Sequence, residues 1–374
     1  MNLVVERKKM LDAVTMGGSM TMKTKGAMPA LEMCKLSFTK DACVLRVSSY
    51  DGESACVKKC SLRSCDEDAQ VLVNPVEVTK LLRSLDDEEV TITLDAASMK
   101  IHHAHGVVTL SVMDADAFPS PKTPSDASAF DIDAMTLCDL LSQARLFTSN
   151  DTLRPALCGV LLSFNDGVMS VSASDAHILY DNSVTVDGLT FTGDVILNSR
   201  VITTLTNMIG KTENARVRVK IGQGVMLFST NDAMLMTRNV EGRFPNVKAV
   251  IPTTHAITLD DIDKSMLKSS LERVLITAPS TQLVKISDAH DAVRIESEDI
   301  EFAKSAVENV SCKKNAECEM TTIGVNGQQL LLVMNAVVSE RMQILMNEPT
   351  RPIVLKDPSD TKKTILVMPV MFTR

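Results

Sequence analysis

The stretches VLRVSSYD (44–51), VMSVSASD (168–175) and AVRIESED (292–299) carry one pattern three times. Each alternates apolar and polar residues, as a half-buried strand does, and each ends in an aspartate. The aspartates are 124 residues apart, from Asp51 to Asp175 and from Asp175 to Asp299. In a chain of 374 residues this period is the size of a domain. The sequence therefore predicts three copies of one domain, with limits near 1–124, 125–252 and 253–374.

A second marker supports the same division. Asn74, Asn198 and Asn326 each precede a segment whose apolar residues recur at helical spacing. Asparagine suits this place because its side chain accepts from the first free N–H groups of a helix, and Pro75 suits the first helical position. The expected buried stripes, in equal phase, are Val78, Leu81, Leu82 and Leu85; Ile202, Leu205, Thr206 and Ile209; and Leu330, Val333, Met334 and Val337.

Each repeat also opens with a predicted helix, over 6–16, 133–147 and 261–275. Short alternating strands such as VTITLD (90–95) and VMLFST (225–230) follow the helices. Each unit is then about two helices packed on an antiparallel sheet, an α+β fold. Proline-rich stretches at 118–126 and 244–254 separate the units, because proline cannot donate to a strand ladder and restricts the residue before it.

Composition limits the classes of function. The net charge of −8 argues against a uniformly basic nucleic-acid binder, although basic residues can be segregated on one face. Tryptophan is absent and tyrosine occurs twice, which disfavours base stacking. No apolar run approaches the roughly 20 residues of a membrane span. The nine cysteines contain no C-x-x-C pair, and we interpret them as reduced thiols in a cytoplasmic protein.

Three segments carry a resemblance to a known family: ASDAHIL (173–179), VEGRFPNVKAVIP (240–252) and the late VMP (367–369). With them, the whole chain resembles the bacterial sliding clamps, the beta subunits of the replicative DNA polymerase. The resemblance implies a head-to-tail homodimer that forms a ring of six similar domains, with helices lining the hole and sheets outside. Such a ring encircles double-stranded DNA, has no catalytic activity and no cofactor, and is opened by a separate clamp loader. It tethers the replicative DNA polymerase alpha subunit, other polymerases and repair proteins that carry clamp-binding peptides.

A ring around DNA needs some basic residues on its inner helices, because duplex DNA carries dense phosphate charge. The candidates on or near those faces are Lys80, Arg83, Arg145, Arg200 and Lys211, and the resemblance adds Lys25. It also implies a dimer seam in which Val108 and Leu110 of one chain face Leu275 and Ile276 of the other.

The resemblance further implies an apolar pocket for partner peptides, a type of site that combines apolar lining with a few polar anchors. Its expected residues are Leu157, Ser174, Ala176, His177, Leu179, Pro245, Val250, Asn326, Leu366, Met368, Pro369 and Val370. Three positions depart from the family's usual residues and alter the expected rim, namely Ile178, Ala249 and Gln329. Ala176 also stands where the family usually has glycine.

Other readings compete with the clamp. Ser174, Asp175 and His177 resemble fragments of a hydrolase triad, but no G-x-S-x-G elbow surrounds the serine, and the aspartate recurs in two repeats without that histidine. His102, His103 and His105 have no nearby cysteine or acid to complete a metal site. A third alternative is a divergent clamp-like scaffold that does not load on DNA.

Overall fold

The structure is a computed structural model that describes residues 1–23, 28–119, 121, 123–124, 127–210, 215–314 and 321–372. Its helices begin where a side chain satisfies the first free N–H groups. The Asn74 side-chain oxygen accepts from the Val76 N–H at 2.9 Å, and Asn326 accepts from Gln329 at 3.0 Å. Asn198 directly precedes its helix. The α-helices are α1 (Arg7–Gly17), α2 (Pro75–Ser84), α3 (Ala134–Arg145), α4 (Ser199–Ile209), α5 (Val247–Val250), α6 (Lys264–Leu275) and α7 (Gly327–Met334).

The predicted helical stripes are buried, as their phase requires. In the first repeat Val78 and Leu82 are fully buried and Leu81 is partly buried. The stripes of the second and third repeats are buried except for Thr206, which is partly buried. The opening helices begin at Arg7, Ala134 and Lys264, close to the expected positions. No helix in the described ranges is long and apolar enough to cross a membrane.

The chain divides into two compact units. The first comprises Met1–Cys138, Val186–Phe191 and Arg200–Asn239, and the second comprises Asp139–Thr185, Thr192–Ser199 and Val240–Arg374. The middle repeat thus contributes residues to both units. The domain limits expected from the repeat, 1–124, 125–252 and 253–374, remain a prediction.

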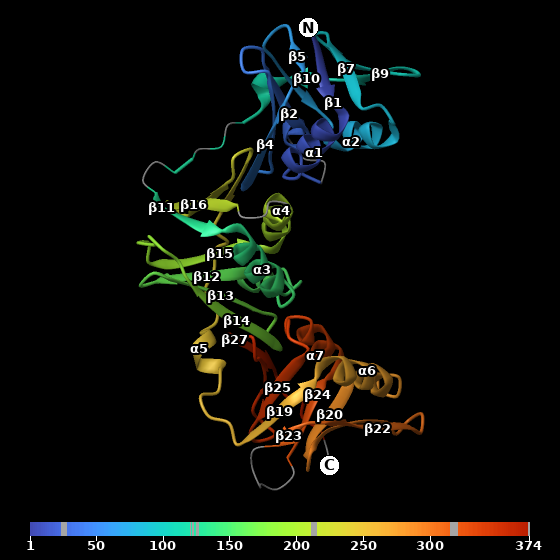
Figure 1. The fold of residues 1–374 in the computed structure, drawn as a ribbon, viewed down its shortest axis with the longest axis vertical. Helices are drawn as coiled ribbons and strands as arrows, with labels where there is room; N and C mark the ends of the chain where they lie inside the picture. The colour runs from blue at the N-terminus through green and yellow to red at the C-terminus, as the bar shows by residue number, and fades with distance from the viewer. Residues whose placement is uncertain are drawn as a thin grey trace. The chain divides into compact units, whose positions relative to one another are not determined.

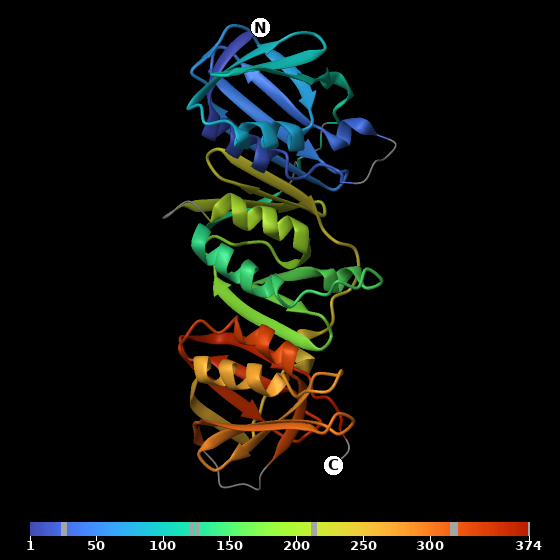
Figure 2. The same cartoon turned by 90° about the vertical axis from the view of Figure 1, so that its right-hand side faces the viewer.

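The first unit contains two antiparallel sheets, with α1 and α2 side by side (Figures 1 and 2). A core of buried side chains such as Leu3, Val14, Leu36 and Val78 lies between these elements. One sheet has the order β5 (Ser64–Cys65), β1 (Asn2–Glu6), β7 (Glu89–Leu94), β8 (Ser98–His103), β9 (Gly106–Ser111). The other has the order β10 (Met113–Asp114), β6 (Ala69–Val73), β2 (Cys34–Thr39), β3 (Val44–Tyr50), β4 (Ser54–Ser61), β18 (Ala233–Arg238), β17 (Val225–Ser229), β16 (Arg216–Gly222), β11 (Ser128–Asp133).

The second unit follows the same plan, with α6 and α7 in contact. One sheet has the order β15 (Gly193–Asn198), β12 (Gly159–Asn165), β13 (Val168–Ser174), β14 (Ile178–Thr185), β27 (Asp360–Val367), β26 (Ile353–Asp357), β25 (Arg341–Met346), β19 (Ile257–Asp263), β23 (Lys313–Lys314). The other has the order β22 (Lys304–Ser311), β21 (Ala292–Asp299), β20 (Leu283–Ala289), β24 (Thr322–Asn326). Short 3-10 helices occur at Pro29–Glu32, Ala115–Ala117 and Pro155–Cys158.

In each unit one long sheet crosses from one repeat to the next. β4 of the first repeat pairs with β18 of the second, and β14 of the second pairs with β27 of the third. We call these two strand pairs the first seam and the second seam. Continuous pairing across a seam leaves no strand edge exposed there, so each repeat boundary is closed by backbone hydrogen bonds.

Candidate peptide-binding and DNA-facing sites

The turn after β13 is built from the repeated aspartate. The Asp175 carboxylate accepts from the backbone N–H groups of His177 and Ile178, both at 2.8 Å. Asp51 accepts in the same way from Glu53 and Ser54. The repeated aspartate is therefore a turn-forming residue, which is a common use of this side chain.

This geometry excludes a hydrolase triad at Ser174. The Ser174 hydroxyl donates to the Ile178 carbonyl oxygen at 2.7 Å and accepts from the Ala176 N–H at 3.1 Å. Asp175 is committed to the backbone of the turn, and His177 is exposed. A triad needs the serine bonded to the histidine and the histidine oriented by the acid, and these contacts are replaced by turn contacts.

Ala176 adopts a φ of +83°, in the left-handed region that a residue with a Cβ rarely occupies. This explains physically why glycine suits the position, and it means that the alanine is held there under mild strain. Ile178, expected on the rim of the pocket, is instead 2% exposed and pairs with Val367 in the second seam. That expectation was wrong, because Ile178 is the first residue of β14 and faces inward.

The C-terminal segment is fixed to the same turn. The Met368 N–H donates to the His177 carbonyl oxygen at 2.7 Å, and the Val370 N–H donates to the Gly324 carbonyl oxygen at 2.7 Å. Gly324 permits this approach: an added Cβ would lie 2.6 Å from the Val370 carbonyl oxygen and from the Phe372 ring. The Lys285 ammonium lies 5.2 Å from the centre of that ring. The segment from Met368 to Phe372 is thus held against the second unit by these contacts.

An apolar cluster lies beside this segment, within the second unit. Its members include three residues predicted from the resemblance: Leu157 and Leu179, each 6% exposed, and Leu366, which is fully buried. Phe244 and Val247 pack on them from the segment before α5 and from α5 itself. Around this buried floor lie residues that solvent reaches more readily, namely Pro245, Val250, Met368, Pro369 and Val370.

Two further predicted residues have other contacts. Asn326 uses its side-chain oxygen to cap α7, and its amide N–H donates to the Thr281 carbonyl at 3.4 Å. Gln329 donates its backbone N–H to that cap and is partly buried, and Ala249 is exposed in α5. The structure therefore brings Leu157, Leu179 and Leu366 of the predicted pocket together, while Asn326 serves as a helix cap.

The basic residues proposed for DNA contact differ among themselves. Lys80 and Arg83 on α2 and Arg145 at the end of α3 are exposed. Arg200 instead forms an ion pair with Asp51 at 3.1 Å and donates to the Ser19 and Thr21 carbonyls at 3.2 and 2.8 Å. These contacts give Arg200 a structural role in joining α4 to the first repeat, which sequence reasoning missed. Lys25 and Lys211 lie outside the described residues.

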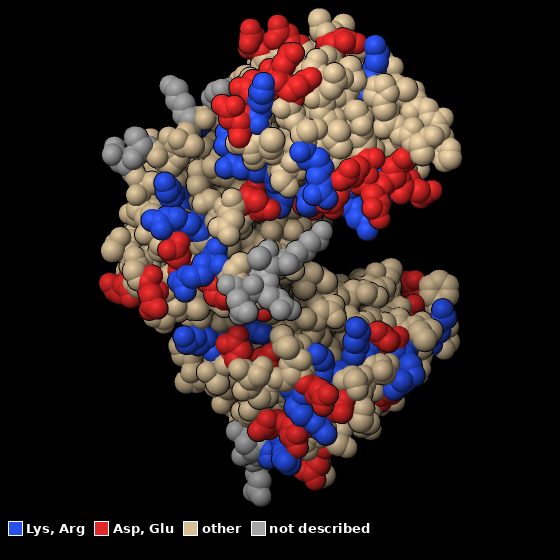
Figure 3. Space-filling model, turned by 45° about the horizontal axis from the view of Figure 1, so that its top comes forward, with Lys and Arg blue, Asp and Glu red and all other residues tan. Residues whose placement is uncertain are grey.

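The charges on the face drawn in Figure 3 are mixed: lysine and arginine alternate with aspartate and glutamate, without a continuous basic field.

The remaining sequence motifs have structural explanations. The His102 ring lies 3.1 Å from the Thr93 hydroxyl on the neighbouring strand. Across the described residues no cluster of three metal-binding side chains occurs. Burial raises the pKa of the Cys34 thiol to about 12 and that of Cys56 to about 11, so both stay protonated and unreactive. The cysteines described by the structure are all free thiols.

Comparisons with known proteins agree with this architecture. Three domain families of the DNA polymerase III beta subunit match in order: the N-terminal domain at residues 1–122, the central domain at 131–246 and the C-terminal domain at 248–371. The beta sliding clamp of Rickettsia felis is 24% identical over 99% of both chains. That of Halalkalibacterium halodurans is 23% identical over 81% of both.

Solved structures share the fold over the full length. The DNA polymerase sliding clamp of Pseudomonas aeruginosa superposes with a TM-score of 0.90 at 19% identity, covering 100% of both chains. The DNA polymerase III beta subunit of Thermotoga maritima gives 0.91 at 20% identity, with the same coverage. The chain belongs to the family of DNA polymerase III beta subunits, the beta sliding clamps.

Proposed function

We propose that this protein is a DNA sliding clamp: a ring that encircles double-stranded DNA and tethers the replicative DNA polymerase and other DNA-processing proteins. It works by topology and by peptide binding rather than by catalysis, in the cytoplasm where replication takes place. A clamp loader opens the ring. The family membership supports this function, and so does the observation that the repeats are joined by two seams of one design.

The seams have matching registers. Ser54, the first residue of β4, stands opposite Thr237, and Ile178, the first residue of β14, stands opposite Val367. Within their own sheets, Thr237 pairs with Met226 and Val367 pairs with Ile353. A third seam of the same design would need a strand like β4 from the third repeat and a strand like β18 from the first.

Both strands exist, and each is the last in its sheet's order among the described residues: β22 and β9. Lys304, the first residue of β22, pairs with Asp299, the repeated aspartate. Leu110 of β9 pairs with Met99, as Thr237 does with Met226. The same register therefore puts Lys304 of one chain opposite Leu110 of a second chain. Such pairing occurs twice in a head-to-tail dimer and closes it into a ring.

Apolar side chains accompany these edges. Val108 and Leu110 are partly buried on β9, and Leu275 is partly buried at the end of α6. Ile276, the next residue, is 76% exposed in the single chain. Because a large exposed apolar residue beside an open strand edge is a feature of association surfaces, we assign Val108, Leu110, Leu275 and Ile276 to the dimer seam.

Partner peptides bind, in this proposal, over the apolar cluster of the second unit. Leu157, Leu179 and Leu366 form the floor, and Met368, Pro369 and Val370 form one wall. A methionine in the wall suits varied ligands, since its thioether side chain repacks easily. Lys80, Arg83 and Arg145 provide weak contacts to the DNA backbone.

The test is retention on DNA before and after a cut. Protein loaded by its clamp loader onto a nicked circle should stay for many minutes, and should leave quickly once the circle is made linear. Charge reversal at Arg83 should impair loading more than retention. Equal dissociation rates on the two substrates would mean ordinary backbone binding, and failure to load would favour the scaffold alternative.

A further inference from the structure

The first unit has a hollow of about 680 Å³ on the face of its long sheet that lies away from α1 and α2. We call it the basic groove and define it by Lys35, Arg46, Lys59, Val57, Phe118 and Met234, all of which line it. It crosses the first seam, because Met234 on β18 stands opposite Val57 on β4.

The repeat makes this groove the counterpart of the apolar cluster in the second unit. Lys35 pairs with Ser48, and Leu161 of the apolar cluster pairs with Ser172; each serine lies three residues before the repeated aspartate. Lys35 therefore occupies the place of Leu161.

Other lining residues correspond in the same way. Ala55 pairs with Tyr50, and Leu179 pairs with Ser174, where Tyr50 and Ser174 each lie directly before the repeated aspartate. Phe118 precedes a proline, as Phe244 does. The chain thus has the same surface feature at both seams. At the first seam the cation Lys35 replaces Leu161 of the aliphatic floor. Beside it, the cations Arg46 and Lys59 stand where the second seam has Ser170 and Ser183.

The charges in the groove are unbalanced. Its described lining includes three cations and no acid. Arg46 stands directly opposite Lys59 on the neighbouring strand, an arrangement that destabilises a sheet when both charges are alike. Neither has an ion pair with a described residue. An anionic ligand would relieve this repulsion, and in a chain of net charge −8 such a concentration of unpaired cations is distinctive.

The lining also selects the kind of anion. Val57, Phe118 and Met234 provide apolar contacts between the cations. Phe118 is the one aromatic residue among the described lining residues, and it packs in a cluster with Ala30, Leu72 and Ala115, so the groove has no platform for stacked bases. We propose that the basic groove binds an extended acidic peptide segment of a partner protein, as a second docking surface beside the apolar peptide site.

The experiment measures peptide binding to the free protein without DNA, so its outcome is independent of clamp loading. The probe is a fluorescein-labelled peptide of eight residues in which aspartate and glutamate alternate with valine. The comparison peptide replaces each acid by its amide. Anisotropy should show binding of the acidic peptide that salt weakens, and little binding of the amide peptide.

Variants locate the site. Arg46→Ser and Lys59→Ser should each lower the affinity for the acidic peptide roughly threefold to fivefold, the effect of losing one exposed ionic contact. Lys220→Ser, which removes an equal charge from an exposed position on β16 of the same sheet, should leave binding unchanged. Met368→Ala, at the apolar site, should also leave it unchanged. Arg46→Ser and Lys59→Ser should raise the melting temperature slightly, because each removes the like-charge pair, and Lys220→Ser should leave it unchanged.

Three results would overturn the proposal. The acidic peptide could bind no better than its amide counterpart. Lys220→Ser could weaken binding as much as Arg46→Ser, which would mean attraction by bulk charge. A thymidine oligonucleotide could displace the peptide and lose affinity on Arg46→Ser, which would make the groove a nucleic-acid site.

Discussion

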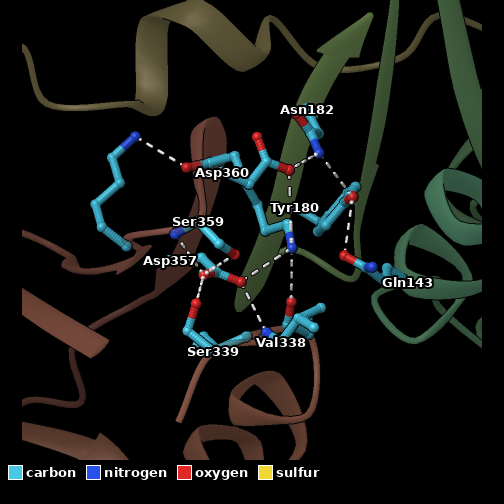
Figure 4. A network of polar contacts seen from close by, with 12 residues as sticks. Gln143, Tyr180, Asn182, Val338, Ser339, Asp357, Ser359 and Asp360 are labelled. Carbon is cyan, nitrogen blue, oxygen red and sulfur yellow. Dashed lines mark hydrogen bonds and ion pairs between the residues drawn. The ribbon is translucent and has the colours of Figure 1, made fainter. Parts of the chain in front are cut away.

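The first and second seams share one backbone register, but their polar side-chain contacts differ in how far water reaches them. At the first, the Ser54 and Thr237 hydroxyls lie 2.9 Å apart, and Lys58 pairs with Asp232 at 2.7 Å. Water reaches the acid of that ion pair, because the Asp232 side chain is 56% exposed while Lys58 is 14% exposed. At the second, the Asn182 amide donates to Asp360 at 2.8 Å in a network around buried residues (Figure 4).

The network at the second seam has at its centre an ion pair that water does not reach. The Lys363 ammonium lies 3.3 Å from the Asp357 carboxylate, and the two side chains are 3% and 0% exposed. Lys363 also donates to the Ala336 carbonyl at 3.1 Å, and Ser339 donates to Asp357 at 2.5 Å. Buried charges persist only when paired and hydrogen-bonded, so the second seam depends on every member of its network.

The backbone and the side chains contribute differently to the two seams. The backbone ladder alone suffices to join two repeats, since both seams have it. The side chains then set how sensitive each seam is to substitution and to pH. The second seam, which lies next to the apolar peptide site, is the more sensitive of the two to substitution and to pH.

Removing one buried charge should have the largest effect. Lys363→Met leaves the Asp357 carboxylate buried without its partner and should lower the free energy of unfolding by about 3–5 kcal/mol. The matched change at the first seam, Lys58→Met, should lower it by about 0–1 kcal/mol, because its partner acids are solvated. Urea unfolding of both variants checks this. Equal losses would show that burial does not distinguish the seams.

The second prediction concerns pH. Burial opposes ionisation of Asp357, but hydrogen bonds from Ser339, Val338 and Ser359 outweigh it and hold the pKa well below its usual range. A lowered pKa in the folded state adds stability above the unfolded value of about 4, and this stability is lost as the pH falls through the folded pKa.

Asp357→Asn should therefore be less stable than the natural chain at pH 7 and should lose less stability on going from pH 5 to pH 3. Asp232→Asn, at the exposed acid of the first seam, serves as the matched control. Melting temperatures at each pH give the answer. A natural chain whose stability is flat from pH 5 to pH 3 would contradict the assignment.

The third prediction concerns the wall beside the second seam. Met368→Ala should weaken binding of a polymerase-derived peptide by about 1–2 kcal/mol, the loss of one apolar anchor. Met371→Ala, three residues later and 74% exposed, should bind normally. Fluorescence titration of both variants decides whether the wall contributes affinity. Normal binding by Met368→Ala would remove this residue from the site.

The smallest expected effect is at the turn of the second seam. Ala176→Gly relieves a positive φ at the expense of some flexibility in the unfolded chain, so it should stabilise the protein by about 0.5 kcal/mol. The corresponding turn of the first seam already has Gly52 at a φ of +101°, and Gly52→Ala should be destabilising. If the two turns are equivalent, calorimetry should show that Ala176→Gly raises the stability of the protein and that Gly52→Ala lowers it.

The sequence predicted the repeat from motifs that recur at a fixed spacing, and it predicted the helices and their buried stripes from residues close together in the chain. The family resemblance predicted the apolar floor of the peptide site, and the structure brings Leu157, Leu179 and Leu366 together. The roles of Arg200 and Lys363 could not be predicted. Arg200 contacts Asp51 across 149 positions, and Lys363 lies in the hydrophilic stretch KDPSDTKK (356–363), which looks like an exposed turn. Alternation locates a strand but does not reveal its partner, so pairing across the seams was also beyond the sequence.

In the proposed ring, a third seam of the same register joins two copies of the chain. The register places Thr109 on β9 opposite Ser305 on β22 of the other copy, and both residues are exposed in the single chain. Opposed strand residues are close enough for a disulfide. The measurement is mild oxidation of a Thr109→Cys, Ser305→Cys double variant, followed by denaturing electrophoresis without reductant. We expect a covalent dimer that neither single variant nor the natural chain forms, and much less of it when Ser305→Cys is replaced by Ser311→Cys. A chain that stays monomeric, or that crosslinks equally well in the shifted pair, would contradict the third seam and the ring that it closes.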